Sequence, residues 1–142
     1  MEITANAVQE VTVGNNVIFT DTAVSGNPAI LHREGSGLVK LRGLTSCQCR
    51  ARFKVFFSGN IAVAEGETVG PIALAITIDG EPVASTTMVV TPAAVRDFFN
   101  VASAVYLNVP ADCCSTVGVR NTSEDDVTIE VQNANLIVER VA

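Results

Sequence analysis

Hydrophobic and polar residues alternate along several short segments of this chain. In residues 50–55, Arg50, Arg52 and Lys54 occupy alternate positions, with apolar residues between them. Residues 127–132 repeat the same two-residue period. Successive side chains of a β-strand point to opposite faces, so this pattern predicts strands with one solvated face. No segment keeps an apolar stripe at helical spacing for three turns.

The same reasoning extends over the whole chain. Asp79-Gly80 is the strongest hairpin signal, because both residues tolerate positive φ in a type I′ turn. Gly59-Asn60 also carries turn chemistry, and Pro92 opens a segment, 92–96, that is expected to form one helical turn. The predicted strands are residues 7–13, 17–20, 29–33, 38–42, 50–57, 72–78, 83–90, 101–109, 116–120, 127–132 and 136–141.

Composition supports this all-β prediction. Val, Ile and Thr make up 44 of the 142 residues, and β-branched side chains favour strands. Evenly spaced short strands with polar turns favour a β-sandwich or barrel. The length predicts one domain, residues 1–142, with residues 1–6 as a candidate extended N-terminal arm. The first residues lack the pattern of a secretory signal, so we expect a chain that is cytosolic when made or already trimmed.

Two predicted strands are apolar on both faces. Isoleucines and a leucine line one face of residues 72–78, and small residues line the other. In 101–109, valines and a leucine oppose alanines and a tyrosine. The outer strand face of a monomeric sandwich is usually polar, so either loops of the same chain or another subunit must cover these faces. We favour a subunit interface, with candidate residues Ala73, Ala75, Ala102, Ala104, Tyr106 and Ile137.

Several segments carry a resemblance to a known group of proteins. Residues 32–43 (HREGSGLVKLRG), 49–53 (CRARF), 69–76 (VGPIALAI), 80–83 (GEPV) and 132–138 (QNANLIV) are similar to small proteins encoded by phages and prophages of Firmicutes. Those proteins resemble trimeric jelly rolls of the tumour necrosis factor and complement type, including the C-terminal domain of collagen-like spore-surface glycoproteins. The resemblance implies a jelly-roll β-sandwich of about ten strands, assembled as a homotrimer around its inner sheet. This sequence departs from the collagen-tailed relatives, because it lacks any Gly-X-Y stalk.

Four cysteines are candidates for special chemistry: Cys47, Cys49, Cys113 and Cys114. Free or buried thiols, disulfides and a metal site all remain open. Zinc sites usually separate paired cysteines by two to four residues, whereas here one residue or none intervenes. Adjacent cysteines rarely bridge one another, so a disulfide would join the two loops or neighbouring subunits.

Catalytic signals are sparse. His32 is the only histidine, and Glu34 is expected on the same strand face. No nucleophile elbow or phosphate-binding loop accompanies them, so we expect no enzyme activity, no cofactor and no resident metal. An acidic cluster at residues 124–126 has oxygen ligands suited to Ca²⁺, but a solvated turn is the more ordinary interpretation. Asn121-Thr122-Ser123 matches a glycosylation acceptor, relevant only in a eukaryotic secretory setting.

Charge defines the expected partners. The net charge is −6, which argues against nucleic-acid binding, and no apolar run is long enough to cross a membrane. Arg50, Arg52 and Lys54 form a basic stripe that we expect to contact acidic groups on a neighbouring subunit or a supporting shell. The expected partners are further copies of the chain and the major capsid protein or another virion protein.

These observations give one leading function and one alternative. The leading function is a structural virion protein, made in the bacterial host cytoplasm, that forms a trimeric capsid decoration or head fibre on the phage head. The alternative is a carbohydrate- or receptor-binding jelly-roll module of a phage fibre or a bacterial spore surface. The sequence contains one Tyr and no Trp, which weighs against sugar stacking.

Overall fold

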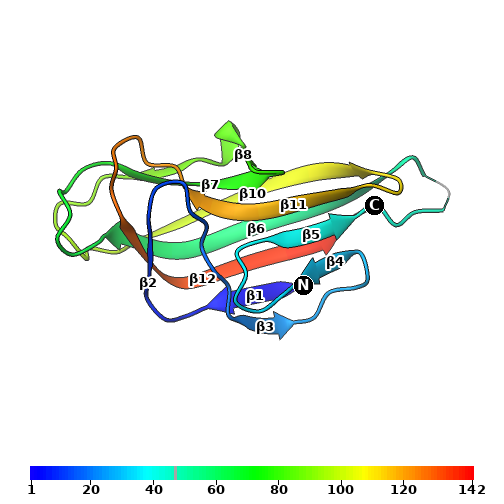
Figure 1. The fold of residues 1–142 in the computed structure, drawn as a ribbon, viewed down its shortest axis with the longest axis horizontal. Helices are drawn as coiled ribbons and strands as arrows, with labels where there is room; N and C mark the ends of the chain where they lie inside the picture. The colour runs from blue at the N-terminus through cyan, green and yellow to red at the C-terminus, as the bar shows by residue number, and fades with distance from the viewer. Residues whose placement is uncertain (47) are drawn as a thin grey trace.

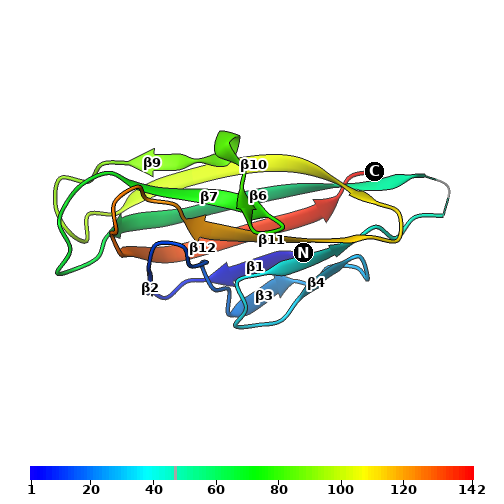
Figure 2. The same ribbon diagram turned by 45° about the horizontal axis from the view of Figure 1, so that its top comes forward.

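Two antiparallel β-sheets face each other in the computed structural model, which describes residues 1–46 and 48–142 (Figures 1 and 2). Sheet A has the order β10-β6-β12-β1-β3, and β2 also pairs with β12. Sheet B has the order β4-β5-β11-β7-β8, and β9 also pairs with β7. The predicted all-β sandwich is confirmed.

Twelve strands and one 3₁₀ turn lie within the described residues. The strands of sheet A are β1 (Glu2–Ala5), β2 (Gln9–Val11), β3 (Asp21–Val24), β6 (Arg50–Val63), β10 (Phe99–Pro110) and β12 (Ile129–Arg140). The strands of sheet B are β4 (Ile30–His32), β5 (Val39–Arg42), β7 (Ile72–Ile78), β8 (Glu81–Pro82), β9 (Met88–Val90) and β11 (Cys114–Asn121). The 3₁₀ turn η1 (Ala84–Thr86) separates β8 from β9. Three of these strands, β1, β3 and β8, were not predicted. The predicted strand 17–20 is wrong, since those residues contribute only an isolated bridge at Phe19. The last two predicted strands join into β12.

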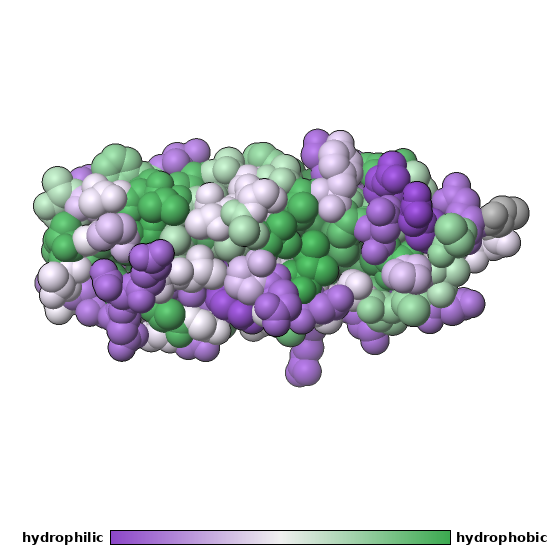
Figure 3. All heavy atoms as spheres, turned by 90° about the horizontal axis from the view of Figure 1, so that it is seen from above, coloured by the Kyte–Doolittle hydropathy of each residue, from purple (hydrophilic) through white to green (hydrophobic). Residues whose placement is uncertain are grey.

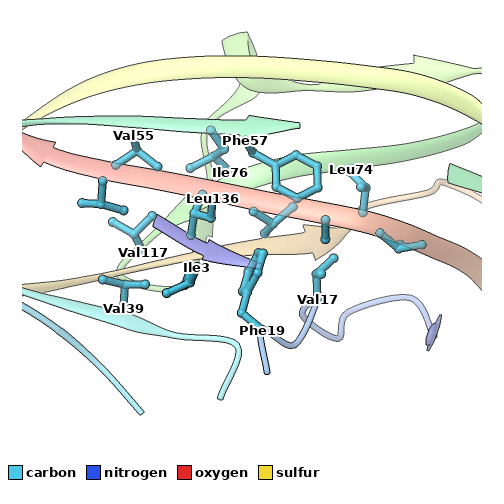
Figure 4. Packing of buried hydrophobic residues seen from close by; sticks show 14 of the residues in the cluster. Ile3, Val17, Phe19, Val39, Val55, Phe57, Leu74, Ile76, Val117 and Leu136 are labelled. Carbon is cyan, nitrogen blue, oxygen red and sulfur yellow. The ribbon is translucent and has the colours of Figure 1, made fainter. Parts of the chain in front are cut away.

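The core lies between the two sheets. Figure 4 shows the side chains of Ile3, Phe57 and Leu136 from sheet A meeting those of Leu74 and Val117 from sheet B. All five are fully buried. Alternation along the strands therefore sends one face of each sheet into a common apolar layer, which is the main source of stability for such a fold.

The strand β6 continues where the sequence predicted a turn. Gly59 and Asn60 lie inside β6 and both pair with β10, and Asn60 also pairs with Gln132 of β12. A Cβ at Gly59 would come within 3.1 Å of the Phe57 ring and 3.5 Å of the Ala134 Cα. Gly59 thus leaves room for the Phe57 ring, at the level where the register of β12 shifts between Gln132 and Asn135. This bulge, with Asn133 at φ 52, also joins the two predicted strands 127–132 and 136–141 into β12.

The N-terminal residues differ from the prediction. The candidate arm, residues 1–6, instead supplies β1, which pairs with both β12 and β3 inside sheet A. The predicted strand 7–13 shortens to β2, because its first residues connect β1 to β2. Ile3 is fully buried, and this apolar anchor explains why the segment joins the sheet.

Two turns predicted between β7 and β10, at residues 79–80 and 92–96, had opposite outcomes. Asp79 and Gly80 have φ values of 53° and 85°, which confirms the turn with two positive φ angles between β7 and β8. Of the predicted return strand 83–90, only β9 forms. Val83 N still donates to Ile76 O at 2.9 Å, but the Ile76 amide donates to the Thr86 hydroxyl at 2.9 Å, so the ladder stops and the turn η1 follows. The helical turn predicted for 92–96 is wrong, since Arg96 adopts a φ of 58° that ends any helical run.

Candidate assembly surface

The outer face of sheet A is the side turned away from the core. Along β10, Val101, Leu107 and Val109 are buried, whereas Ala102, Ala104 and Tyr106 are exposed. Tyr106 is the most exposed large hydrophobic residue, at 62%. No described element of the chain lies over these three residues, so the alternative of self-coverage by loops does not hold for β10.

Strand register places further apolar side chains beside them. Ala104 lies opposite Phe56 of β6, and Phe56 lies opposite Ile137 of β12. The side chains of Phe56 and Ile137 are both only half-buried. The apolar strip of sheet A is therefore Ala102, Ala104, Tyr106, Phe56 and Ile137. Sequence analysis missed Phe56 because it shares the β6 face with three basic residues, and that face was interpreted as solvated.

Ala73 and Ala75 do not belong to this strip, and their assignment to a subunit interface is wrong. They lie on β7 of sheet B, and the chain itself buries them. Their cross-strand partners on the same face are Val89 and Arg120. Because alanine carries only a methyl group, longer neighbouring side chains cover it without a second subunit.

One end of the same outer face is covered by the chain itself. The loop between β9 and β10 brings Arg96 Nε to 3.3 Å from the Oε2 atom of Glu130, a buried residue of β12. Glu130 lies opposite Ala62 of β6, which is also buried. The chain therefore covers the apolar surface at this end and leaves the strip around Tyr106 uncovered.

The strand β10 is also the edge of sheet A. Its twelve residues pair with β6 on one side only. Figure 3 looks down on the side where β8 and β10 lie uppermost in Figure 1, and hydrophobic surface there alternates with polar side chains. A long unpaired edge next to an apolar strip is a typical place for association with another chain.

The basic stripe Arg50, Arg52 and Lys54 lies on the outer face of sheet A, beside the apolar strip. Among the described residues, none of the three forms an ion pair with a carboxylate. Arg52 Nε donates to Asn108 Oδ1 at 3.2 Å across the β6–β10 ladder. Two open hollows of about 380 and 520 Å³ share Arg52 and Asn108, and Tyr106 lines the larger. We call these two adjoining hollows the trough. It is lined by the cations of Arg50 and Arg52, the amide of Asn108 and the ring of Tyr106.

Three of the four cysteines can be placed. Cys49, Cys113 and Cys114 are free and exposed, so the interpretation as buried hydrophobes is wrong for them. Cys47 lies outside the described residues. The two cysteine-bearing loops are adjacent: Ala111 N donates to Cys49 O at 2.9 Å, and Gly43 N donates to Cys113 O at 2.9 Å. Within the part of the chain that the structure describes, no group of three potential metal ligands clusters.

His32 and Glu34 do not share a strand face. The strand β4 ends at His32, and Glu34 follows in an exposed turn. The His32 Nε2 atom lies 2.9 Å from Ser36 O, and its ring meets Phe19 edge-on with centroids 6.4 Å apart. The ring thus closes a turn by bonding a backbone carbonyl, and Glu34 is not positioned to orient it.

The remaining sequence candidates have structural surroundings that account for them. Glu124 and Asp125 line a hollow of about 240 Å³ beside Val89, with no metal cluster among the described residues. Asn121 is completely buried, and its amide donates to Val11 O and Val127 O. The Asn121 acceptor motif is therefore closed to modification in the folded protein. No described residues form a helix long and apolar enough to span a bilayer.

Comparison with known proteins identifies the fold class. The globular domain of a zebrafish complement 1qA protein matches with a TM-score of 0.53 at 11% identity, covering 96% of this chain and 93% of that one. The sugar-binding EclA C-terminal domain matches at TM-score 0.44 and 12% identity, covering 95% and 79%. Pika GITRL matches at 0.43 and 9%, covering 95% and 98%. No family model and no curated protein matches the sequence.

The complement match confirms the jelly-roll β-sandwich. Its low identity supports the fold alone, so function has to be argued from the surface of this chain. That surface offers an apolar strip, a long sheet edge and an uncompensated basic stripe.

Proposed function

We propose that the protein is a structural component that assembles as a homotrimer through the outer face of sheet A. The observation that carries this proposal is the apolar strip around Tyr106. Solvent-exposed alanines allow close approach of another surface, and tyrosine is enriched among residues that contribute most to binding. A second copy is the occupant that best explains the strip, because the free β10 edge lies directly beside it.

Charges on the same face also favour a second copy. Lys54 lies opposite Glu139, and Ile137 lies opposite Glu2. The outer face of sheet A thus carries a basic stripe along β6 and acidic side chains on β12 and β1. A surface with both signs can complement itself when copies are rotated about an axis.

The sequence resemblance to phage and prophage proteins supports a place for this trimer in a virion. We propose that it decorates the capsid or forms a head fibre, with the major capsid protein or another virion protein as partner. It would be made in the bacterial host cytoplasm. The role proposed for it is non-catalytic and requires no nucleic acid or membrane.

The decisive experiment measures the mass of the purified chain in solution by light scattering at low concentration. The wild-type protein should have three times the 14.9 kDa mass of one chain. Tyr106→Glu places a charge in the middle of the strip and should shift the population to monomers, since a central interface residue contributes roughly 2 kcal/mol or more. A monomeric wild-type protein at all concentrations contradicts the proposal.

Leu31→Glu is the matched control. Leu31 is 43% exposed and lies on β4 of sheet B, away from the apolar strip. This variant adds the same charge to an exposed apolar position, so its mass should remain that of the wild type. Dissociation by both variants to the same extent would indicate a general charge effect and would reject the assigned face.

Carbohydrate or receptor binding is the second candidate. The trough between β6 and β10 places the exposed Tyr106 ring beside Asn108 and Arg52. An aromatic face with adjacent hydrogen-bonding groups suits a sugar ring, and such a module fits a phage fibre or a spore surface.

The two candidates differ in what Tyr106→Ala changes. If the tyrosine binds a glycan, the variant loses binding on a glycan array and keeps the wild-type mass. If the tyrosine is an interface anchor, the variant dissociates. Asn108→Ala adds a second test, because it removes a hydrogen-bonding group from the trough and leaves the apolar strip intact.

A further inference from the structure

Two of the exposed cysteines lie at the same open end of the sandwich, in the adjacent loops that connect the sheets. Cys49 immediately precedes β6 of sheet A, and Cys113 immediately precedes β11 of sheet B. In Figure 1, these loops form the end of the molecule opposite to β2. A bond at this end would form within one chain, with or without the proposed trimer.

Backbone hydrogen bonds hold the two loops together. The β6–β10 ladder pairs Arg50 with Pro110 and continues through the bond from Ala111 N to Cys49 O, at 2.9 Å. The chain then turns, with Cys113 N donating to Pro110 O at 3.0 Å. Partners in antiparallel strands have Cα atoms about 5 Å apart, so the turn returns Cys113 to the neighbourhood of Cys49.

Gly43 allows the two loops to approach closely. Its amide donates to Cys113 O, and its own carbonyl accepts from Asp112 N at 3.2 Å. A Cβ at Gly43 would lie 2.0 Å from Pro110 O, which no side chain could tolerate. The contact between these loops is thus built into the fold.

Strand alternation selects Cys113 over Cys114. In β6, Ala51 and Phe53 are buried, so position 49 continues the set of residues that faces sheet B. In β11, Val117 and Val119 are buried, so position 113 continues the set that faces sheet A, whereas Cys114 falls on the outer face. Extended beyond the strand ends, this alternation assigns Cys49 and Cys113 the inward positions at the rim of the two sheets, where both side chains are exposed.

We propose that Cys49 and Cys113 form an intrachain disulfide that closes this end of the sandwich under oxidising conditions. The oxidant is a low-molecular-weight disulfide. The thiolate of one cysteine attacks it, forms a mixed disulfide and releases one small thiol. The second cysteine thiolate then attacks the mixed disulfide at the protein sulfur, forms the Cys49–Cys113 bond and releases the second small thiol. Two protein thiols are oxidised and one small disulfide is reduced to two thiols.

The test incubates the full-length protein with oxidised glutathione and counts the remaining free thiols. The wild-type chain should lose two thiols, and its intact mass should fall by two hydrogens without dimer on a non-reducing gel. Trypsin leaves both Cys47 and Cys49 in residues 43–50, and both Cys113 and Cys114 in residues 97–120. Single serine substitutions therefore identify the bonded pair. Cys49→Ser and Cys113→Ser should abolish the bridge, whereas Cys47→Ser and Cys114→Ser should retain it.

Stability gives a second measurement. A bond between residues distant in sequence restricts the unfolded chain, so oxidation should raise the thermal unfolding midpoint by several degrees. Reductant should reverse the shift in the wild-type and Cys114→Ser proteins, and oxidation should produce no shift in Cys113→Ser. The assignment is overturned if no thiols are lost, if covalent oligomers are the product, or if Cys47→Ser or Cys114→Ser abolishes the bridge.

Discussion

At the scale of single residues, Asn121 shows how one buried polar side chain links separate parts of the sandwich. Its Nδ2 donates to Val11 O in β2 and Val127 O before β12, and its Oδ1 accepts from the Ser123 amide and hydroxyl. Ser123 Oγ in turn accepts from Ala73 N of β7 at 3.0 Å. Because every polar atom of the Asn121 amide is bonded, the network stabilises the fold despite its burial.

Asn121→Ala should therefore be strongly destabilising. It leaves two backbone carbonyls and the Ser123 groups without partners in a buried site, at a cost of about 2–4 kcal/mol. Denaturant unfolding of the variant measures this loss. Asn100→Ala is the control, since Asn100 is exposed and its amide bonds only neighbouring groups. A loss for Asn121→Ala no larger than that of the control would contradict this role.

At the scale of elements, the connection between β6 and β7 is tied to the start of β12. Glu67 Oε1 accepts a hydrogen bond from Thr128 N at 2.9 Å. This bond to the charged carboxylate lowers the pKa of Glu67 from its ordinary value of 4.5. The Glu67 carboxylate thus fixes a surface loop to sheet A. The folded state favours the ionised form of this side chain more than the unfolded state does.

The lowered pKa of Glu67 gives a pH-dependent contribution with a definite sign. A carboxyl with a lower pKa in the folded protein stabilises the fold above its unfolded pKa, 4.5, and this stabilisation disappears as the pH falls through the folded pKa. The unfolding midpoint of the wild-type protein should therefore exceed that of Glu67→Gln at neutral pH. The difference should narrow when thermal unfolding is measured at decreasing pH below 4.5. A difference that stays constant over this range would contradict the assignment.

At the scale of the whole molecule, charge is distributed unevenly. The net charge is −6, yet Arg50, Arg52 and Lys54 stand together on the outer face of sheet A without a carboxylate partner among the described residues. Exposed charges interact over about 10 Å at 0.1 M salt, so such a stripe attracts acidic groups on an approaching surface. In the proposed assembly, these groups belong to a neighbouring copy or to the supporting capsid.

Reversing Arg50 and Arg52 to Glu together should weaken assembly, and added salt should reduce the difference from wild type. The reason is that attraction becomes repulsion, and both are screened by ions. Light scattering across a salt series measures this effect. Arg33→Glu combined with Lys40→Glu changes the net charge equally, at exposed positions outside sheet A, and should leave assembly unchanged. Equal weakening by both pairs, or none by the first, would argue against the stripe.

The fold class was predictable because alternation reports which residues can be buried. The span of β7 was predicted at the observed limits, and the two faces of β10 were assigned correctly. Local turn chemistry was less reliable: Asp79-Gly80 forms its turn, whereas Gly59-Asn60 continues a strand beside the bulge in β12. Gly, Asn and Asp residues are compatible with a turn or with an irregular point in a strand. Pairing with a neighbouring strand decides which of the two forms.

The candidate surface was predictable only in part, for the same reason. The sequence by itself determined that β10 and β7 each carry a second apolar face, because side-chain alternation is a local property. Only the tertiary structure decided which of these faces is uncovered: neighbouring strands bury Ala73 and Ala75, whereas nothing in the described chain covers Ala102, Ala104 and Tyr106. Coverage depends on contacts between segments distant in sequence, and packing of the whole chain fixes those contacts.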